Sequence, residues 1–189
     1  MDSPNIVFVL TDQQRWYTCG CYGQNMDLTP NLDRMAEKGV KFEHAFSCQP
    51  VCGPARACIQ TGKYPTETGN YVNNIPLPIA EPTIAKYLSS AGYETAYIGK
   101  WHLADGRKHK FSPVEEEYRG GYKDFWLGAH ALKPISKSYG GYVWDTDNNK
   151  VDFPEGRYRT DVLTDWAIDY IKNRTSKKPF FLFRSYHEP

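Results

Sequence analysis

The sequence predicts an α/β protein in which a mostly parallel sheet is flanked by helices on both faces. The chain has 189 residues, of which 40% are hydrophobic, and this is enough for the core of one domain. Short apolar runs alternate with helical patterns, as they do in parallel sheets with crossover helices. One such run lies just before residue 189 with no helix after it. We therefore expect the chain to be the amino-terminal part of a larger domain, with the carboxyl-terminal part missing.

The first elements are predicted from short local signals. Residues 5–10 (NIVFVL) form an uninterrupted apolar run, which is typical of a strand buried on both faces. A helix is expected from Pro30, with Thr29 as its N-cap, and it should end at Gly39. The apolar face of this helix consists of Leu32, Met35 and Ala36. Residues 40–46 are a second strand candidate.

The rest of the chain continues the alternation, apart from one long segment. Further elements are expected as helices over 54–62, 83–90 and 161–172, and as strands over 93–98 and 180–183. Between 105 and 156 the alternation of strand and helix patterns is no longer visible, and the segment is rich in Gly, Pro, Tyr and charged residues, which indicates a long insertion. The domain assignment is therefore one unit, 1–189, with an insertion at about 105–156.

Charge and hydropathy exclude several classes of protein. The 23 Lys and Arg residues nearly balance the 22 Asp and Glu residues, so we expect no nucleic-acid partner. No apolar run approaches the roughly 18 residues of a membrane span, so we expect no membrane partner. The run at 6–10 is too short for the core of a signal peptide. These features favour a cytoplasmic protein.

The five cysteines do not form a recognisable framework. Their odd number, without a secretory signal, argues against structural disulfides. Cys19 and Cys21 are spaced too tightly for a usual zinc site, and the pair Cys48 and Cys52 has no obvious partner pair. Reduced, partly buried thiols are the simplest interpretation, and a zinc-binding interaction domain is an alternative.

Chemically capable residues follow the predicted strands. Ligands of open parallel sheets bind beyond the carboxyl ends of the strands. The residues expected at that edge are a carboxylate, a thiol, two cations and two imidazoles: Asp12, Cys52, Arg56, Lys100, His102 and His187. Each alone has an ordinary explanation as a surface, turn or loop residue. Their convergence on one edge predicts a site.

The segment Cys52-Gly-Pro-Ala-Arg56 is the sharpest local motif. If Pro54 is the first helical residue, Cys52 lies just before the helix, near free backbone N–H groups that suit an anion. Arg56, one turn further, would add a charge-assisted hydrogen bond. The alternative is a small buried thiol before a proline-started helix.

These residues resemble a known family. The pattern Cys52-x-Pro54-x-Arg56-x4-Thr61-Gly62 resembles the signature of type I sulfatases, of the alkaline-phosphatase-like superfamily, and residues 99–103 (GKWHL) resemble their second signature. Residues 5–12, 29–42 and 185–189 are similar to further segments of that family. The resemblance implies the alkaline-phosphatase-like fold and hydrolysis of small sulfuric esters.

The resemblance also implies roles for the site residues. A separate maturation enzyme would oxidise Cys52 to formylglycine, whose hydrate attacks sulfur and later collapses to release sulfate. Arg56 would steady the nucleophile, Lys100 would bind a sulfate oxygen and His102 would accept the hydrate proton. His187 would protonate the leaving oxygen or pair with the sulfate. A divalent metal, by resemblance Ca²⁺ with Mg²⁺ or Mn²⁺ as alternatives, would be bound by Asp12, Gln13 and the modified Cys52.

Some positions depart from the family pattern. Many members have two acids where this chain has Asp12 followed by Gln13, and this variant also resembles choline sulfatases and phosphonate monoester hydrolases. A phosphate or phosphonate ester is therefore an alternative substrate. Ala55 replaces the commoner Ser. Asn73 is a candidate substrate contact, with a polar turn as the alternative. The second metal-ligand pair of the family has no counterpart up to residue 189, so we expect the chain alone to have an incomplete metal site and little activity.

Three readings compete with a formylglycine-dependent sulfatase. One is a phosphodiesterase or phosphonate monoester hydrolase on the same scaffold. Another is a non-catalytic binding fragment in which Cys52 remains a thiol. The zinc-binding interaction domain is the third.

Overall fold

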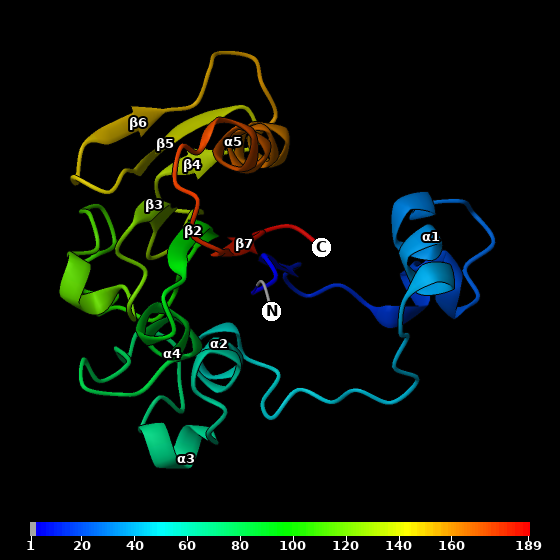
Figure 1. The fold of residues 1–189 in the computed structure, drawn as a ribbon, viewed down its shortest axis with the longest axis horizontal. Helices are drawn as coiled ribbons and strands as arrows, with labels where there is room; N and C mark the ends of the chain where they lie inside the picture. The colour runs from blue at the N-terminus through cyan, green and yellow to red at the C-terminus, as the bar shows by residue number, and fades with distance from the viewer. Residues whose placement is uncertain (1–2) are drawn as a thin grey trace.

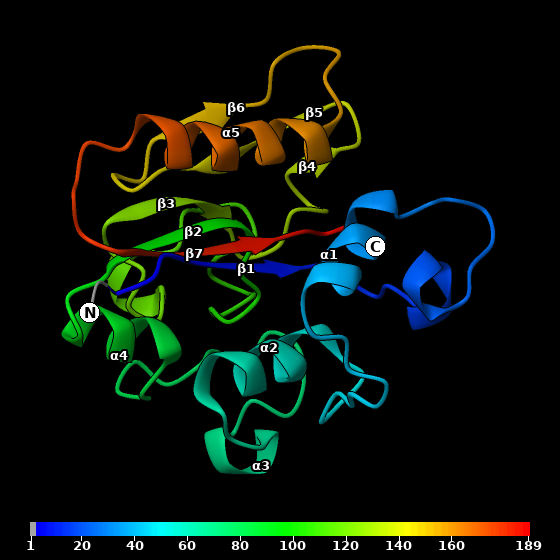
Figure 2. The same ribbon diagram turned by 45° about the vertical axis from the view of Figure 1, so that its right-hand side comes forward.

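The fold is built around one mixed sheet, seen edge-on in Figure 2. A computed structural model describes residues 3–189 and contains a seven-stranded sheet of order β1-β7-β2-β3-β5-β4, with β6 paired to β5 (Figure 1). The strands are β1 Ile6–Leu10, β2 Glu94–Lys100, β3 Phe125–Ala129, β4 Ser136–Lys137, β5 Gly140–Trp144, β6 Lys150–Asp152 and β7 Phe180–Ser185. Strands β1, β7, β2 and β3 run parallel, whereas β4, β5 and β6 pair in antiparallel fashion. The α/β prediction is confirmed.

Helices cover both faces of the parallel strands. They are α1 Pro30–Lys38, α2 Cys52–Thr61, α3 Pro65–Thr68, α4 Ile84–Ser90 and α5 Arg159–Asn173. In Figure 2, α5 lies on one side of the sheet and α2 and α4 lie on the other. Because side chains alternate along a strand, Leu182 packs on the α5 side while Phe181 and Phe183 pack on the α2 and α4 side. Among the described residues, no helix has the length and apolar character needed to span a bilayer.

Strand β1 was predicted to be buried on both faces, and this was wrong. In the sheet formed by residues 3–189 it is an edge strand, with β7 as its one partner. Its side chains alternate between half-buried and exposed, and Val7 and Val9 are 48% and 58% exposed. An apolar run reports hydrophobicity on both faces of a strand, but burial also needs a covering layer. The described residues supply that layer only on the α2 side.

A small lobe formed by α1 and two 3-10 turns, Trp16–Thr18 and Gly20–Tyr22, lies apart from the sheet (Figure 1). The lobe is held together by polar contacts, such as that of Asp33 Oδ1 with the backbone N–H of Cys21 at 2.7 Å. The predicted helix is present, but its apolar residues Leu32 and Met35 are exposed.

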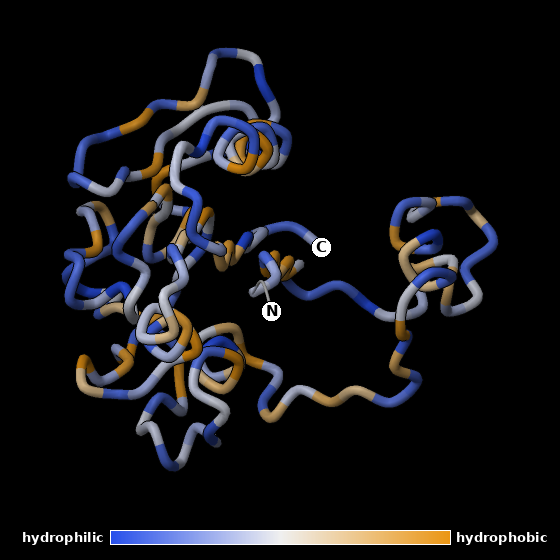
Figure 3. The backbone as a smooth tube through the Cα atoms, viewed as in Figure 1, coloured by the Kyte–Doolittle hydropathy of each residue, from blue (hydrophilic) through white to orange (hydrophobic). Residues whose placement is uncertain are grey.

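The segment that leads from this lobe to α2 corrects a second prediction. Residues 40–46 were predicted as a strand, but they have no regular structure and all of them are exposed. Hydrophobic residues are visible along this segment in Figure 3. The pattern of Val40, Phe42 and Phe46 resembles that of a strand, but a strand also needs a pairing edge, and none is adjacent to this segment among the described residues.

The segment 105–156 contains more regular structure than the sequence indicated. It holds a 3-10 turn, Glu116–Tyr118, and the strands β3, β4, β5 and β6. Strand β3 belongs to the central sheet and pairs in parallel with β2, Ala96 opposite Phe125 and Lys100 opposite Ala129. Its sequence, FWLGA, is short and contains a glycine, so it does not stand out from the surrounding Gly- and Tyr-rich residues.

Gly99 allows the end of β2 to lie close to β7. Its φ is +115°, and a Cβ at this position would lie 1.9 Å from the carbonyl oxygen of Ser185. We expect Gly99→Ala to lower the free energy of unfolding by about 3 kcal/mol, because it combines left-handed strain with overpacking against backbone. Urea denaturation with Gly62→Ala as a control measures this. Gly62 also has positive φ but has open space around it, so equal losses for the two variants would contradict the expected clash.

Candidate active site

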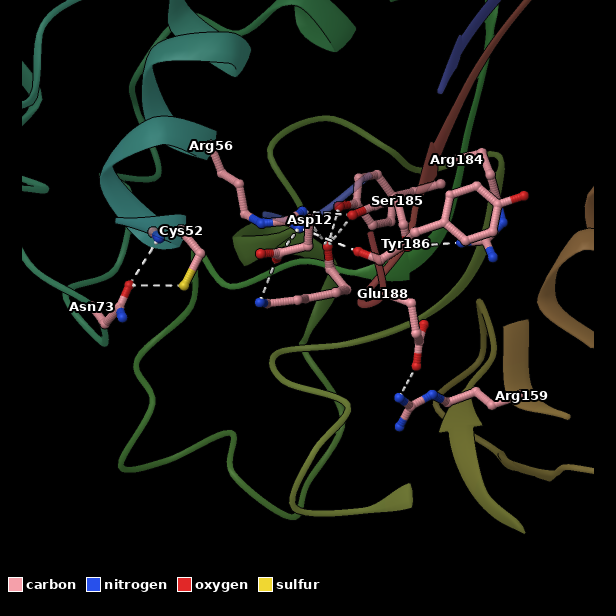
Figure 4. Close-up of polar contacts among 12 residues, drawn as sticks. Asp12, Cys52, Arg56, Asn73, Arg159, Arg184, Ser185, Tyr186 and Glu188 are labelled. Carbon is pink, nitrogen blue, oxygen red and sulfur yellow. Dashed lines mark hydrogen bonds and ion pairs between the residues drawn. The ribbon is translucent and has the colours of Figure 1, made fainter. Parts of the chain in front are cut away.

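Three charged side chains meet at the carboxyl ends of the parallel strands (Figure 4). Asp12 follows β1, Arg56 comes from α2 and Lys100 is the last residue of β2. Asp12 Oδ2 accepts hydrogen bonds from Lys100 Nζ at 2.6 Å and from Arg56 Nη2 at 3.0 Å. Both cations are buried, and the carboxylate is 17% exposed. Two positive charges therefore surround one negative charge. The cluster has a net positive charge, which favours binding of an anion.

Arg56 is fixed by further bonds to the ends of two strands. Its Nη1 donates to the carbonyl oxygen of Lys100 at 2.8 Å and to Ser185 Oγ at 2.5 Å. Residue 56, one turn into α2, therefore reaches the ends of β2 and β7. The guanidinium thus joins α2 to the sheet at the site.

The charge pairs also alter the acidity of Asp12. Burial raises the pKa of its carboxyl group, but the hydrogen bonds and positive charges of Lys100 and Arg56 outweigh burial and hold the pKa below its usual value. Asp12 is therefore a carboxylate at neutral pH.

Cys52 begins α2 and lies beside Asn73. The sequence placed Cys52 just before the helix, whereas α2 starts at Cys52 itself and Val51 is the N-cap. The Cys52 thiol donates to Asn73 Oδ1 at 3.4 Å, and the same oxygen accepts from Gly53 N at 2.8 Å. A Cβ on Gly53 would approach Asn73 Oδ1 to 2.9 Å, so glycine permits this contact. Asn73 thereby caps one of the free N–H groups at the start of α2.

The thiol of Cys52 borders the same cavity as Asp12 and Arg56. This cavity has a volume of about 720 Å³, and its lining includes Asp12, Gln13, Cys52, Arg56 and Asn73. The side chain of Gln13 is exposed, and its φ is +58°. The volume lies in the range of small-molecule sites. The fold thus brings together residues that are up to 61 positions apart in sequence around one space.

Two of the predicted histidines are near the cluster and uncharged. Burial, with added repulsion from Lys100, His130 and Arg56, lowers the pKa of His102 to about 3. Burial and the charge of Lys100 also lower the pKa of His187. The Nδ1 atoms of both rings are buried without a hydrogen-bond partner among the described residues. Neutral imidazoles at this edge can accept protons.

The described residues do not by themselves fit a divalent metal. Among residues 3–189, no group of three or more His, Cys, Asp or Glu side chains is arranged to bind an ion. Asp12 supplies one carboxylate, and its Oδ2 is already paired with two cations. Ca²⁺ takes six to eight oxygen ligands, so Asp12 and Gln13 would provide only part of a set.

Sequence reasoning missed three residues next to the site: Asn74, His130 and Ser185. Ser185 is the last residue of β7 and contacts Arg56, a position that the rule on strand ends covers. His130 follows β3, which was not predicted as a strand, so it had no place at the sheet edge. Asn74 adjoins Asn73, and its φ of +70° gave no signal in the sequence.

Comparison with known proteins identifies similar chains. Residues 4–189 match the family model described as Sulfatase. The chain is 36% identical to N-acetylglucosamine-6-O-sulfatase of Bacteroides thetaiotaomicron, with 98% of this chain and 30% of that protein covered. It is 37% identical to the ulvan-active sulfatase of Formosa agariphila, with 95% and 34% covered. The chain therefore spans about a third of the length of these curated relatives.

A solved structure resembles the fold closely. The structure of BT4656 in complex with its substrate D-glucosamine-2-N,6-O-disulfate superposes with a TM-score of 0.80 at 35% identity. The match covers 96% of this chain and 34% of that one.

Proposed function

Because this chain belongs to the sulfatase family, we propose that the protein hydrolyses sulfuric esters, with Cys52 as the position of the nucleophile. The observation that carries this proposal is that Cys52 lines the same cavity as Asp12 and Arg56, while Lys100 pairs with Asp12. A sulfate ester carries one negative charge, which matches the excess positive charge of the Asp12, Arg56 and Lys100 cluster. Both the family and the local electrostatics support the same substrate class.

The cations have distinct tasks in this proposal. Lys100 uses one donor on Asp12 and has two more N–H groups for a sulfate oxygen. Arg56 is held by the backbone of β2 and by Ser185, so it stabilises negative charge without having to reorganise. Asp12 keeps the two cations in place and limits their mutual repulsion.

Cys52, the proposed position of the nucleophile, is accessible from the cavity. Cys52 is partly exposed at the rim of the cavity, and its side chain is oriented by Asn73. We propose that Cys52 is converted to formylglycine by a separate maturation enzyme. When formed, that group supplies a hydrate hydroxyl that attacks sulfur and a second hydroxyl whose deprotonation releases sulfate. Asn73 then orients the side chain at position 52 and lies at the edge of the substrate.

The two histidines supply proton transfer. His102 is uncharged at neutral pH and accepts a proton from the nucleophile side of the site. His187 lies on the segment after β7, with Lys100 and Asp12 among the charges around it. In the proposal it donates a proton to the leaving oxygen, which requires the negative charge of bound substrate to raise its pKa.

Metal and substrate identity are further parts of the proposal. Asp12 Oδ1 and the Gln13 amide are candidates for part of a Ca²⁺ site, with Mg²⁺ or Mn²⁺ as alternatives, whose remaining ligands come from outside the described residues. No step above depends on that ion. The names of the relatives, an N-acetylglucosamine-6-O-sulfatase and an enzyme bound to a glucosamine disulfate, favour a sulfated saccharide as substrate.

The test compares ester classes with the full-length protein from its native host. Rates are measured on 4-nitrophenyl sulfate, on glucosamine 6-sulfate and on an aryl phosphonate monoester. We expect hydrolysis of the sulfate esters at least about tenfold faster than that of the phosphonate, because the chain belongs to the sulfatase family and both ester classes carry the same single negative charge. Faster phosphonate hydrolysis would assign the site to phosphorus esters. No hydrolysis of any of the three, from protein whose Cys52 peptide shows conversion by mass spectrometry, would overturn the proposal.

A further inference from the structure

A second histidine, His130, lies directly behind His102. It follows β3, which neighbours β2, and both histidines therefore occupy the same edge of the sheet. His130 is only 2% exposed. The backbone N–H of His102 donates to the carbonyl oxygen of His130 at 2.7 Å, which extends the pairing of β2 with β3 beyond the last strand residues. The site residue and its neighbour are thus fixed to each other through the backbone.

The backbone of His102 needs this support. Its φ is +62°, a left-handed conformation that costs a non-glycine residue about 1 kcal/mol or more. Trp101 N also donates to the carbonyl oxygen of Ala129 at 2.9 Å, so two consecutive residues after β2 are tied to the end of β3. These bonds fix the backbone from which the imidazole of His102 extends.

The two rings are also adjacent. Their centroids are 5.0 Å apart with an interplanar angle of 72°. The Nδ1 atom of each ring is buried and has no hydrogen-bond partner among the described residues. Two unpartnered nitrogens in neighbouring buried rings are costly unless one of them donates to the other, directly or through a water molecule.

The contact with Asn74 determines which ring nitrogen of His130 can accept a hydrogen bond. His130 Nε2 lies 3.3 Å from Asn74 Oδ1, and because that oxygen only accepts, the proton of His130 is on Nε2. Asn74 packs closely against Gly106, and a Cβ at that position would lie 2.0 Å from Asn74 Oδ1, so glycine leaves the room that this amide needs. His130 Nδ1 is then left with a lone pair that points into the buried region shared with His102.

We propose that His130 is a positioning residue for His102: His130 Nδ1 accepts a hydrogen bond that originates from His102 Nδ1–H, directly or through one bridging water molecule, and this leaves His102 Nε2 free to accept a proton. When His102 takes up a proton at Nε2, the proton on Nδ1 stays in place and the bond to His130 strengthens, because the donor is then charged. Asn74 fixes the tautomer of His130, as a third group orients the base of a catalytic triad. The role in catalysis rests on the proposed function, whereas the tautomer pair does not.

Three substitutions separate the two nitrogens of His130. His130→Asn places an acceptor oxygen near the position of Nδ1, His130→Gln places a donor near the position of Nε2, and His130→Phe keeps a ring with neither. In the full-length protein we expect kcat to fall about tenfold to a hundredfold for the Gln and Phe variants, with KM nearly unchanged, and to be rescued to within about threefold by Asn. Equal losses for Asn and Gln, or wild-type kcat in the Gln variant, would overturn the proposal.

A spectroscopic measurement tests the pair without turnover. Imidazole ¹⁵N chemical shifts of the wild type should place the His102 proton on Nδ1 and the His130 proton on Nε2, and the His130→Phe variant should shift His102 toward a mixture of tautomers. A proton on His102 Nε2 in the wild type would refute the pair. If the tautomers are as expected but no ester is hydrolysed, the proposed function fails and the pair stands.

A matched control is available in His109. It is also 2% exposed, but its Nδ1 contacts the Asp105 carbonyl oxygen at 3.0 Å and its Nε2 contacts Glu115 at 2.5 Å. His109→Gln should leave both kcat and the His102 shifts unchanged. A change as large as that of His130→Gln would mean that any buried histidine in this region has the same effect, which would contradict a specific pair.

Discussion

Replacing Asp12 with alanine is expected to lower the free energy of unfolding by about 3 kcal/mol. The variant leaves Arg56 and Lys100 as two buried cations without the carboxylate that both contact. Removing one partner of a buried ion pair costs about 3–5 kcal/mol, and the partial exposure of Asp12 favours the lower end. This is a large share of the 5–15 kcal/mol that stabilises an ordinary domain. Urea denaturation at neutral pH measures the loss.

A surface pair and the pH dependence provide the controls for Asp12. Asp165 pairs with Arg157 at 2.7 Å, but both side chains are about half exposed, so Asp165→Ala should cost less than about 1 kcal/mol. The pKa of Asp12 is lowered in the folded state, so its contribution is present above about pH 4 and is lost as the pH falls further. The difference in free energy of unfolding between the wild type and Asp12→Ala should therefore become smaller in acid. A difference that is equal at pH 7 and pH 3 would contradict this account.

Cys52→Ala should abolish ester hydrolysis while leaving the fold intact. The side chain at position 52 is the proposed source of the nucleophile, and loss of a nucleophile removes a covalent route that the remaining residues do not replace. We expect kcat to fall by at least about a thousandfold. Stability should change by less than about 1 kcal/mol, because the partly exposed thiol makes one weak contact, with Asn73. Turnover in the full-length protein and urea denaturation measure the two effects.

Cys58 on the same helix is the control for Cys52. It lies further along α2 and does not line the cavity. Burial raises the pKa of its thiol to about 11, so it is not a thiolate at neutral pH. Cys58→Ala should keep wild-type kcat. Equal losses for the two cysteine variants would indicate damage to α2 rather than loss of the nucleophile.

The sequence predicted the strands and helices that have strong local signals. Strand β7 is apolar on both faces and lies in the interior of the sheet, and α5 has a clear helical period, so both appear where expected. The same pattern in β1 was misleading because burial depends on neighbours that are distant in sequence. Strand β3 was missed because five residues with a glycine carry little local information, although its pairing with β2 makes it part of the sheet.

The candidate site was predictable to the extent that it lies at strand ends. Asp12 and Lys100 each come at or just after an apolar run, so the topology of a parallel sheet brings them to one edge. The contact of both Lys100 and Arg56 with one oxygen of Asp12 was not predictable, because the position of Arg56 depends on how α2 is rotated against the sheet. His130 could not be assigned before β3 was known, and its relation to His102 depends on the register between β2 and β3.

The order of the strands also determines when the site can form during synthesis. Among the described residues, strand β1 pairs with β7 alone, and the bond from Phe180 N to Asn5 Oδ1 spans 175 residues of sequence. At about 5–20 residues per second, β1 waits roughly 10–35 s on the ribosome for its partner. Until β7 is made, Arg56 also lacks Ser185, so the start of α2 is not yet anchored to the sheet. The arrangement of the strands therefore delays the anchoring of Arg56, and with it the completion of the site, until β7 joins the sheet.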